Sequence, residues 1–121
     1  MNSVSNLKFG FSPCPNDTYI LDAIVNKHID CRDINFDFFV SDVEVLNQKA
    51  FNEELDITKL SFHAWLKVHS KYILLNSGSA LGRGCGPLLI SKKTLNINKL
   101  TEYSVAIPGK NTTANLLLNI F

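Results

Sequence analysis

The amino-acid sequence predicts an α/β domain with a largely parallel sheet. Short apolar or alternating segments recur along the 121 residues, helical segments separate the first of them, and capping residues precede several helices. The expected order is β-α-β-α-β-α-β-β-β-α, and this alternation favours parallel pairing of the strands. A hydrophobic fraction of 45% and a charged fraction of 19% are typical of a globular protein with its own core.

Six short strands are expected. They lie at residues 7–11, 35–40, 56–61, 72–76, 88–91 and 104–107. The first two alternate between polar and apolar residues, as half-buried strands do. The last three are mostly apolar, so the sequence predicts that they are buried.

Helices are expected after the first three strands and at the end of the chain. The first runs from residue 18 to about residue 27, with Asn16 or Asp17 as its cap. Ser41 and Glu44 resemble a capping box for a second helix, which ends at residue 50 or 51. The remaining helical segments are residues 62–68, a single turn at 98–102 and an apolar helix at 114–121.

Charge and cysteine content argue against several classes of protein. The net charge of +1, without runs of one sign, gives no indication of nucleic-acid or membrane-surface binding. No apolar run approaches the roughly 20 residues of a spanning helix and the N-terminus lacks a signal-peptide pattern, so a cytoplasmic location is expected. Cys14, Cys31 and Cys85 form no C-x-x-C pair and fit reduced thiols.

The glycine-rich loop at residues 77–87 is the first candidate ligand site. It holds four of the six glycines, together with Ser77, Ser79 and Arg83, between two apolar segments. Backbone amides and a guanidinium in such a loop favour a small polar or anionic ligand. The alternative is an irregular crossover loop, because the sequence matches neither a dinucleotide fingerprint nor a P-loop.

Two further loops follow predicted strands, where α/β folds hold their ligands. Residues 12–17 form a proline-stiffened loop, for which a plain capped turn is an equally good interpretation. Thr112 and Thr113 bring hydroxyls and free amides to a helix N-terminus, which suits a carboxylate or phosphate. Simple helix capping is the alternative there.

Polar residues around the third predicted strand are weaker candidates. Lys59 and Ser61 face the same side by alternation, and the lysine either binds an anionic group or reaches solvent. His63 could act as a base, although a single histidine beside aromatic residues is more often a packed core residue. The histidines lack metal-ligand spacing, so no metal is expected.

Four stretches occur together and in order: SPCPNDT at 12–18, DITKLSFHA at 56–64, SGSALGRGCGP at 77–87 and IPGKNTTANLL at 107–117. This set resembles the 1,4-dihydroxy-6-naphthoate synthase family of the futalosine route to menaquinone. The resemblance implies a type II periplasmic-binding-protein-like fold, with two α/β lobes around a cleft. It also implies a carbon–carbon lyase that converts cyclic dehypoxanthine futalosine to 1,4-dihydroxy-6-naphthoate without a metal or organic cofactor.

The same resemblance implies the site residues. Substrate would be bound by Lys59, Leu60, Ser61, Thr112 and Thr113. The cleft would be lined by Ser12, Asn16, Asp17, Ser77, Ser79 and Arg83. The general base of the family is a histidine expected beyond Phe121, so no catalytic residue is assigned within this chain.

The resemblance further divides the chain into a first lobe at residues 1–97 and a hinge with the first βα unit of a second lobe at 98–121. We therefore expect the N-terminal portion of a synthase, inactive alone, that self-associates through its truncated edge. Its expected partner is a small-molecule substrate, with no nucleic acid and no membrane. The alternative is a non-catalytic protein of the same fold that binds a carboxylate or related anion.

Overall fold

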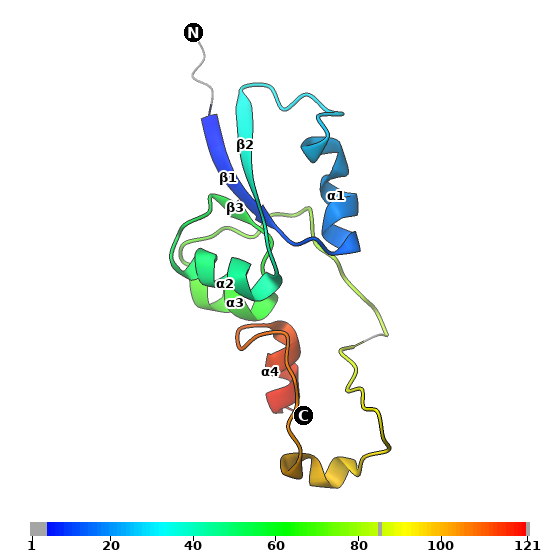
Figure 1. Ribbon diagram of the computed structural model, residues 1–121. Coiled ribbons are helices and arrows are strands. Elements are labelled where there is room, and N and C mark those ends of the chain that lie inside the picture. The colour runs from blue at the N-terminus through cyan, green and yellow to red at the C-terminus, as the bar shows by residue number, and fades with distance from the viewer. Residues whose placement is uncertain (1–4, 85, 121) are drawn as a thin grey trace.

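The computed structural model describes residues 5–84 and 86–120 (Figure 1). Expectations that concern Cys85 and Phe121 lie outside these described residues. The elements are β1 (Ser5–Phe11), α1 (Pro15–Val25), β2 (Ile34–Val40), α2 (Val43–Phe51), β3 (Ile57–Thr58), α3 (Phe62–Val68), the 3₁₀ helix η1 (Ile97–Glu102) and α4 (Thr113–Ile120). No described helix is long and apolar enough to cross a membrane.

The three described strands form one parallel sheet in the order β2-β1-β3. Phe9 of the central strand pairs with Phe38 on one side and Ile57 on the other. The first two strands occupy the positions that their alternation predicted. The third is shorter than expected, because after Thr58 only one ladder bond continues, from the Lys59 amide to the Gly10 carbonyl at 2.8 Å.

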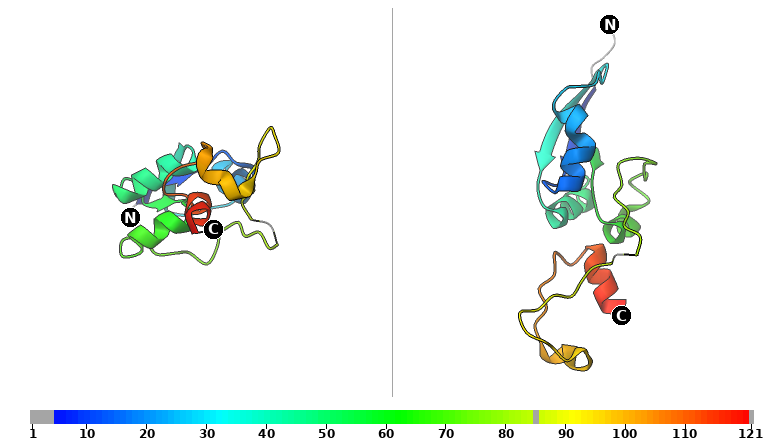
Figure 2. Two further views of the ribbon diagram at one scale, coloured as in Figure 1. Left: turned by 90° about the horizontal axis from the view of Figure 1, so that it is seen from below. Right: turned by 90° about the vertical axis from the view of Figure 1, so that its right-hand side faces the viewer.

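Alternation along β1 gives the sheet two different faces. Phe9 and Phe11 point to one face, where they are buried with Leu21 of α1. Figure 2 shows α1 lying along one face of the sheet. Gly10 points the other way, and a Cβ there would lie 2.6 Å from Leu55 Cδ1 and 2.8 Å from a Cδ of Leu46 in α2. Glycine is therefore needed at this position so that α2 can approach the sheet.

The helix starts differ from the sequence expectation. Cys14 is the N-cap residue of α1, and Pro15 takes the first helical position, so the prediction that Asn16 or Asp17 caps this helix is wrong. Asp42 caps α2 by accepting bonds from the amides of residues 44 and 45, so the prediction of Ser41 as the cap is also wrong. In both cases the side chain predicted as a cap lies one to three residues from the actual N-cap position.

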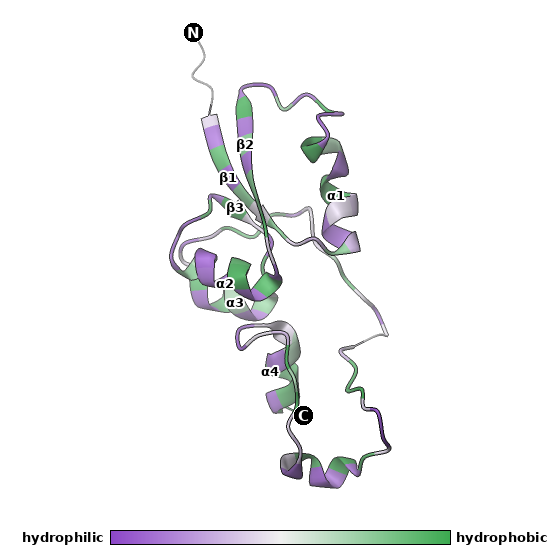
Figure 3. Cartoon of the chain, in the orientation of Figure 1, coloured by the Kyte–Doolittle hydropathy of each residue, from purple (hydrophilic) through white to green (hydrophobic). Residues whose placement is uncertain are grey.

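The described residues of 73–107 lie away from the sheet, and we call them the extended segment. The strands predicted at 72–76, 88–91 and 104–107 are absent from the described structure, so this prediction is wrong. Ile73 is 91% exposed and Leu88 is 84% exposed, which also contradicts the predicted burial. In Figure 3, hydrophobic residues (green) occur along this segment, away from the sheet. An apolar segment forms a strand only where the backbone of an adjacent strand supplies hydrogen-bond partners.

Candidate functional site

Six of the predicted site residues gather in two polar clusters near the carboxyl ends of β1 and β3. The first, the Asp17 cluster, consists of Ser12, Asp17, Lys59 and the carbonyl of Gly78. The second, the Asn111 cluster, docks residues 109–113 onto α2 and α3. Each cluster joins segments that are far apart in the sequence.

The Asp17 carboxylate is the centre of the first cluster. It is only 5% exposed. One of its oxygens accepts the Ser12 amide at 3.1 Å and the Ser12 hydroxyl at 2.8 Å, and the other lies 3.0 Å from Lys59 Nζ. Lys59 also donates to the Gly78 carbonyl at 2.6 Å, so it ties the glycine-rich loop to the first helix.

These bonds keep Asp17 ionised. Burial by itself would raise the pKa of the Asp17 carboxyl, but the hydrogen bonds from the Ser12 hydroxyl and from Lys59 outweigh it, and the pKa is lowered. An ammonium has three N–H donors, and Lys59 uses two of them on Asp17 and Gly78. No described residue accepts a hydrogen bond from the third donor.

The Asn111 cluster begins with Glu44 on α2. Its two oxygens accept the Asn111 backbone amide at 3.1 Å and the Asn111 side-chain amide at 2.7 Å. Gly109 makes this approach feasible: its φ is 153°, and a Cβ there would lie 2.4 Å from Glu44 Oε2. Burial would raise the pKa of Glu44, but the hydrogen bonds led by the Asn111 side chain lower it.

The start of α3 forms hydrogen bonds with the turn at residues 111–113. Ser61 caps α3 by accepting the Ala64 amide, and its hydroxyl donates to the Asn111 carbonyl at 2.6 Å. The His63 amide donates to Thr113 Oγ1 at 3.3 Å, and His63 Nδ1 lies 3.2 Å from the Thr112 carbonyl. Since a carbonyl only accepts, Nδ1 carries a proton in this contact.

These contacts divide the residues predicted to bind substrate. Thr112 is 4% exposed, and its hydroxyl donates to the Gly109 carbonyl while accepting the Asn115 amide, so it serves as a helix cap. The Ser61 hydroxyl is likewise engaged inside the protein. The Thr113 hydroxyl accepts from His63, and its own proton has no acceptor among the described residues. Leu60 is half-buried, and in the sequence it stands between Lys59 of the Asp17 cluster and Ser61 of the Asn111 cluster.

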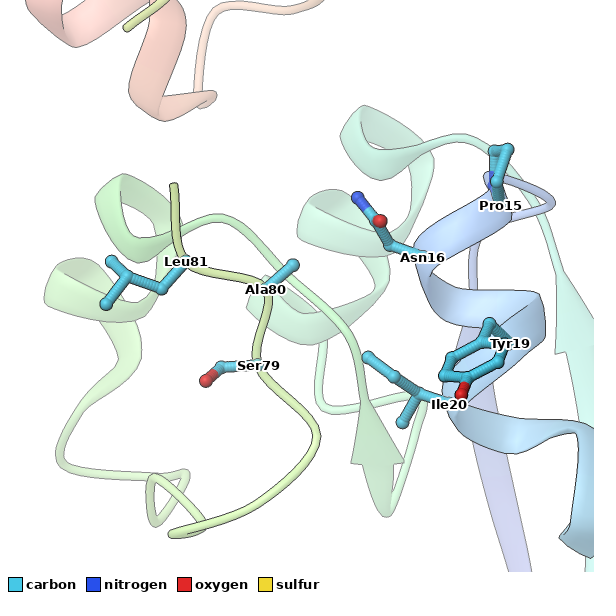
Figure 4. A pocket seen from close by; sticks show the side chains of 7 residues that line it. All are labelled: Pro15, Asn16, Tyr19, Ile20, Ser79, Ala80 and Leu81. Atoms are coloured by element: carbon cyan, nitrogen blue, oxygen red, sulfur yellow. The ribbon is translucent and has the colours of Figure 1, made fainter. Parts of the chain in front are cut away.

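Four of the six expected cleft residues lie apart from Ser12 and Asp17. Asn16 and Ser79 line an open groove of about 520 Å³ between α1 and the glycine-rich loop, together with Pro15, Tyr19, Ile20, Ala80 and Leu81 (Figure 4). Ser77 and Arg83 are exposed on the same loop and do not line this groove. The prediction that Lys59 and Ser61 lie on a strand is wrong: Lys59 follows the last residue of β3, and Ser61 is the N-cap residue of α3.

The sequence interpretation missed the residue on which the second cluster rests. Asn47 is fully buried, accepts the Ser61 amide at 3.1 Å and donates toward Glu44 and the Asn111 carbonyl. Its position between Leu46 and Ala50 on the apolar face of α2 was the available signal. Glu44 was interpreted as a capping and surface residue, which its contacts with Asn111 correct. No three described His, Cys, Asp or Glu side chains are grouped to hold a metal.

The chain was compared with known protein families, and the match includes all four sequence stretches described above. Residues 7–121 match the family model described as menaquinone biosynthesis. The chain belongs to this menaquinone biosynthesis family. The resemblance found in the four sequence stretches is thereby confirmed.

Similar proteins of the family are longer. The chain is 43% identical to a 1,4-dihydroxy-6-naphthoate synthase of Thermus thermophilus and 34% identical to one of Streptomyces coelicolor, over 95% and 98% of its own length. It spans 41% of the length of each. A crystal structure of an Archaeoglobus fulgidus protein matches with a TM-score of 0.85 at 33% identity, over 95% of this chain and 42% of that one.

Proposed function

We propose that this chain forms the first lobe, and the start of the second, of a 1,4-dihydroxy-6-naphthoate synthase with a type II periplasmic-binding-protein-like fold. The enzyme would be a carbon–carbon lyase acting on cyclic dehypoxanthine futalosine, without a metal or organic cofactor. Two similar proteins that carry this name support the proposal.

The structural support for this proposal is the contact between the start of α3 and the turn at residues 111–113. The two segments expected to bind substrate are separated by about 50 residues, yet Ser61 and His63 hold the turn at 111–113 by direct hydrogen bonds. Such a double attachment is more than helix capping requires. It brings Thr113 to a fixed place beside the start of α3.

The chemistry of the two clusters suits a ligand with a carboxylate and hydroxyls. Lys59 retains one charged donor and Thr113 retains one hydroxyl donor. The N-terminus of α4 adds backbone amides that favour an anionic group. These groups bind and orient a substrate, whereas the proton acceptor is expected outside the described residues.

Binding and turnover of cyclic dehypoxanthine futalosine test this function. The wild-type chain should bind it in calorimetry without releasing dihydroxynaphthoate, and Thr113→Val, which keeps the shape but removes the hydroxyl, should weaken binding by about 10-fold. Thr101→Val in η1 is the matched control and should have no effect, because Thr101 is exposed away from both clusters.

Two results would contradict parts of the proposal. Product formation by this chain would place the base within these residues and make His63 the first residue to replace. Equal affinity for simple carboxylates and for the substrate would instead favour the non-catalytic anion-binding protein.

A further inference from the structure

We infer that the groove between α1 and the glycine-rich loop receives the flat aromatic part of a carboxylate-bearing ligand, with the Tyr19 ring as its stacking wall. This inference rests on the proposed function for the class of ligand. The position of the groove and the character of its walls come from the structure alone.

The groove has apolar walls that come from two distant parts of the chain. Tyr19 is 87% exposed on α1, and on the glycine-rich loop the Ala80 side chain points toward α1 while that of Leu81 points away (Figure 4). Figure 4 shows Tyr19 and Ile20 on one side of the opening and residues 79–81 on the other. A large apolar ring exposed to water beside other apolar side chains marks a surface that is covered by a ligand or partner.

A small molecule fits this surface better than a polypeptide does. The volume of about 520 Å³ lies in the range of small-molecule sites, which combine apolar walls with a few polar groups. Asn16 supplies an amide on the α1 wall, whereas Ser79 on the opposite wall points its hydroxyl away from α1 (Figure 4). Tyrosine offers a π face for stacking as well as apolar area, so it favours a planar ring over an aliphatic chain.

Each wall of the groove adjoins the Asp17 cluster along the chain. Asn16 precedes Asp17, and Ser79 follows Gly78, the two groups that Lys59 bonds at 3.0 Å and 2.6 Å. Lys59 therefore fixes one wall relative to the other. Its ammonium carries the positive charge that a ligand carboxylate would need, and both groups that it bonds are next in sequence to groove residues.

The probes separate stacking from simple apolar contact. They are 2-naphthoate and its saturated analogue decahydronaphthalene-2-carboxylate, titrated into the chain and followed by NMR shifts or calorimetry. Tyr19→Leu should weaken 2-naphthoate binding by about 3- to 10-fold, and Tyr19→Phe should leave it within about 2-fold. The affinity for the saturated analogue should change by less than about 2-fold in both variants.

Tyr103→Leu is the matched control, because Tyr103 is an exposed tyrosine that follows η1 and does not line the groove. An effect of Tyr103→Leu equal to that of Tyr19→Leu would overturn the inference. So would a failure of the wild-type chain to bind 2-naphthoate, or a change in sedimentation with Tyr19→Leu that reveals an interface between copies.

The groove assignment and the proposed function fail in different ways. If Thr113→Val loses affinity for cyclic dehypoxanthine futalosine while Tyr19→Leu keeps its affinity for 2-naphthoate, the function stands and the groove assignment is wrong. If Tyr19→Leu weakens 2-naphthoate binding while cyclic dehypoxanthine futalosine does not bind at all, the groove stands and the proposed function is wrong.

Discussion

The sheet region, residues 5–72, and the extended segment, residues 73–107, are both rich in apolar side chains but use them differently. In the sheet region, Phe9 and Phe11 are buried under α1, and Leu46 is completely buried on the opposite face. In the extended segment, Ile73 and Leu88 are almost fully exposed. Figure 1 shows this segment as a wide excursion that ends where α4 returns to α3.

The difference shows that burial depends on a partner and not on composition. β1 has a strand on each side, and its two faces are covered by different helices. The extended segment is instead held at two places. The near attachment is the bond from Lys59 to Gly78, close to the start of the segment, and the far attachment is the Asn111 cluster at residues 109–113, just after its end. The stability of the described fold should therefore depend on the sheet region and on these two attachments.

The largest expected effect comes from the core of the sheet region. Leu46→Ala should lower the free energy of unfolding by about 2–5 kcal/mol, because the lost side chain leaves a cavity beside Gly10. Ile73→Ala removes a similar side chain in the extended segment and should change it by less than about 0.5 kcal/mol. Urea unfolding of both variants measures the contrast, and equal losses would show that the two regions are packed alike.

An intermediate effect is expected at the far attachment. Asn47→Asp keeps the acceptor for the Ser61 amide but removes the donor and places a second carboxylate beside Glu44, so it should cost about 2–3 kcal/mol at pH 7. Asn119→Asp on α4 is the control, since Asn119 is exposed. Thermal unfolding at pH 7 checks both, and a neutral Asn47→Asp would mean that the turn is held by other contacts.

Local signals predicted the parts of the fold that depend on nearby residues. The helical segment predicted at residues 62–68 is α3 with its observed bounds, and alternation gave β1 and β2. The apolar segment at 88–91 has the same local signal as a buried strand, but pairing is decided by distant backbone groups. For that reason the sequence could not separate the two regions.

The site was predictable to the same degree. Lys59 and Thr113 stand in ordered motifs, and their role in substrate binding stays a prediction; among the described residues each keeps one donor without an acceptor. Asn47 was missed because its importance arises from a contact with Asn111, 64 residues further on. Thr112 was predicted to meet substrate, yet only the structure shows that its hydroxyl is occupied as a cap.

The smallest expected effect concerns the near attachment and depends on pH. The pKa of Asp17 is lower in the folded chain than its ordinary value, so the stability it provides is present above about pH 4 and is lost as the pH falls through the folded pKa. Asp17→Asn should therefore be less stable than wild type by about 1 kcal/mol near pH 6, with the difference vanishing toward pH 2.

Urea unfolding at several pH values checks this closing difference, with Asp37→Asn, an exposed carboxyl on β2, as the control. Glu44 also has a lowered pKa, but it titrates in both proteins and cancels in the comparison. A difference between wild type and Asp17→Asn that stays constant from pH 6 to pH 2 would show that the shape of Asp17, and not its charge, joins Lys59 and the glycine-rich loop to the sheet region.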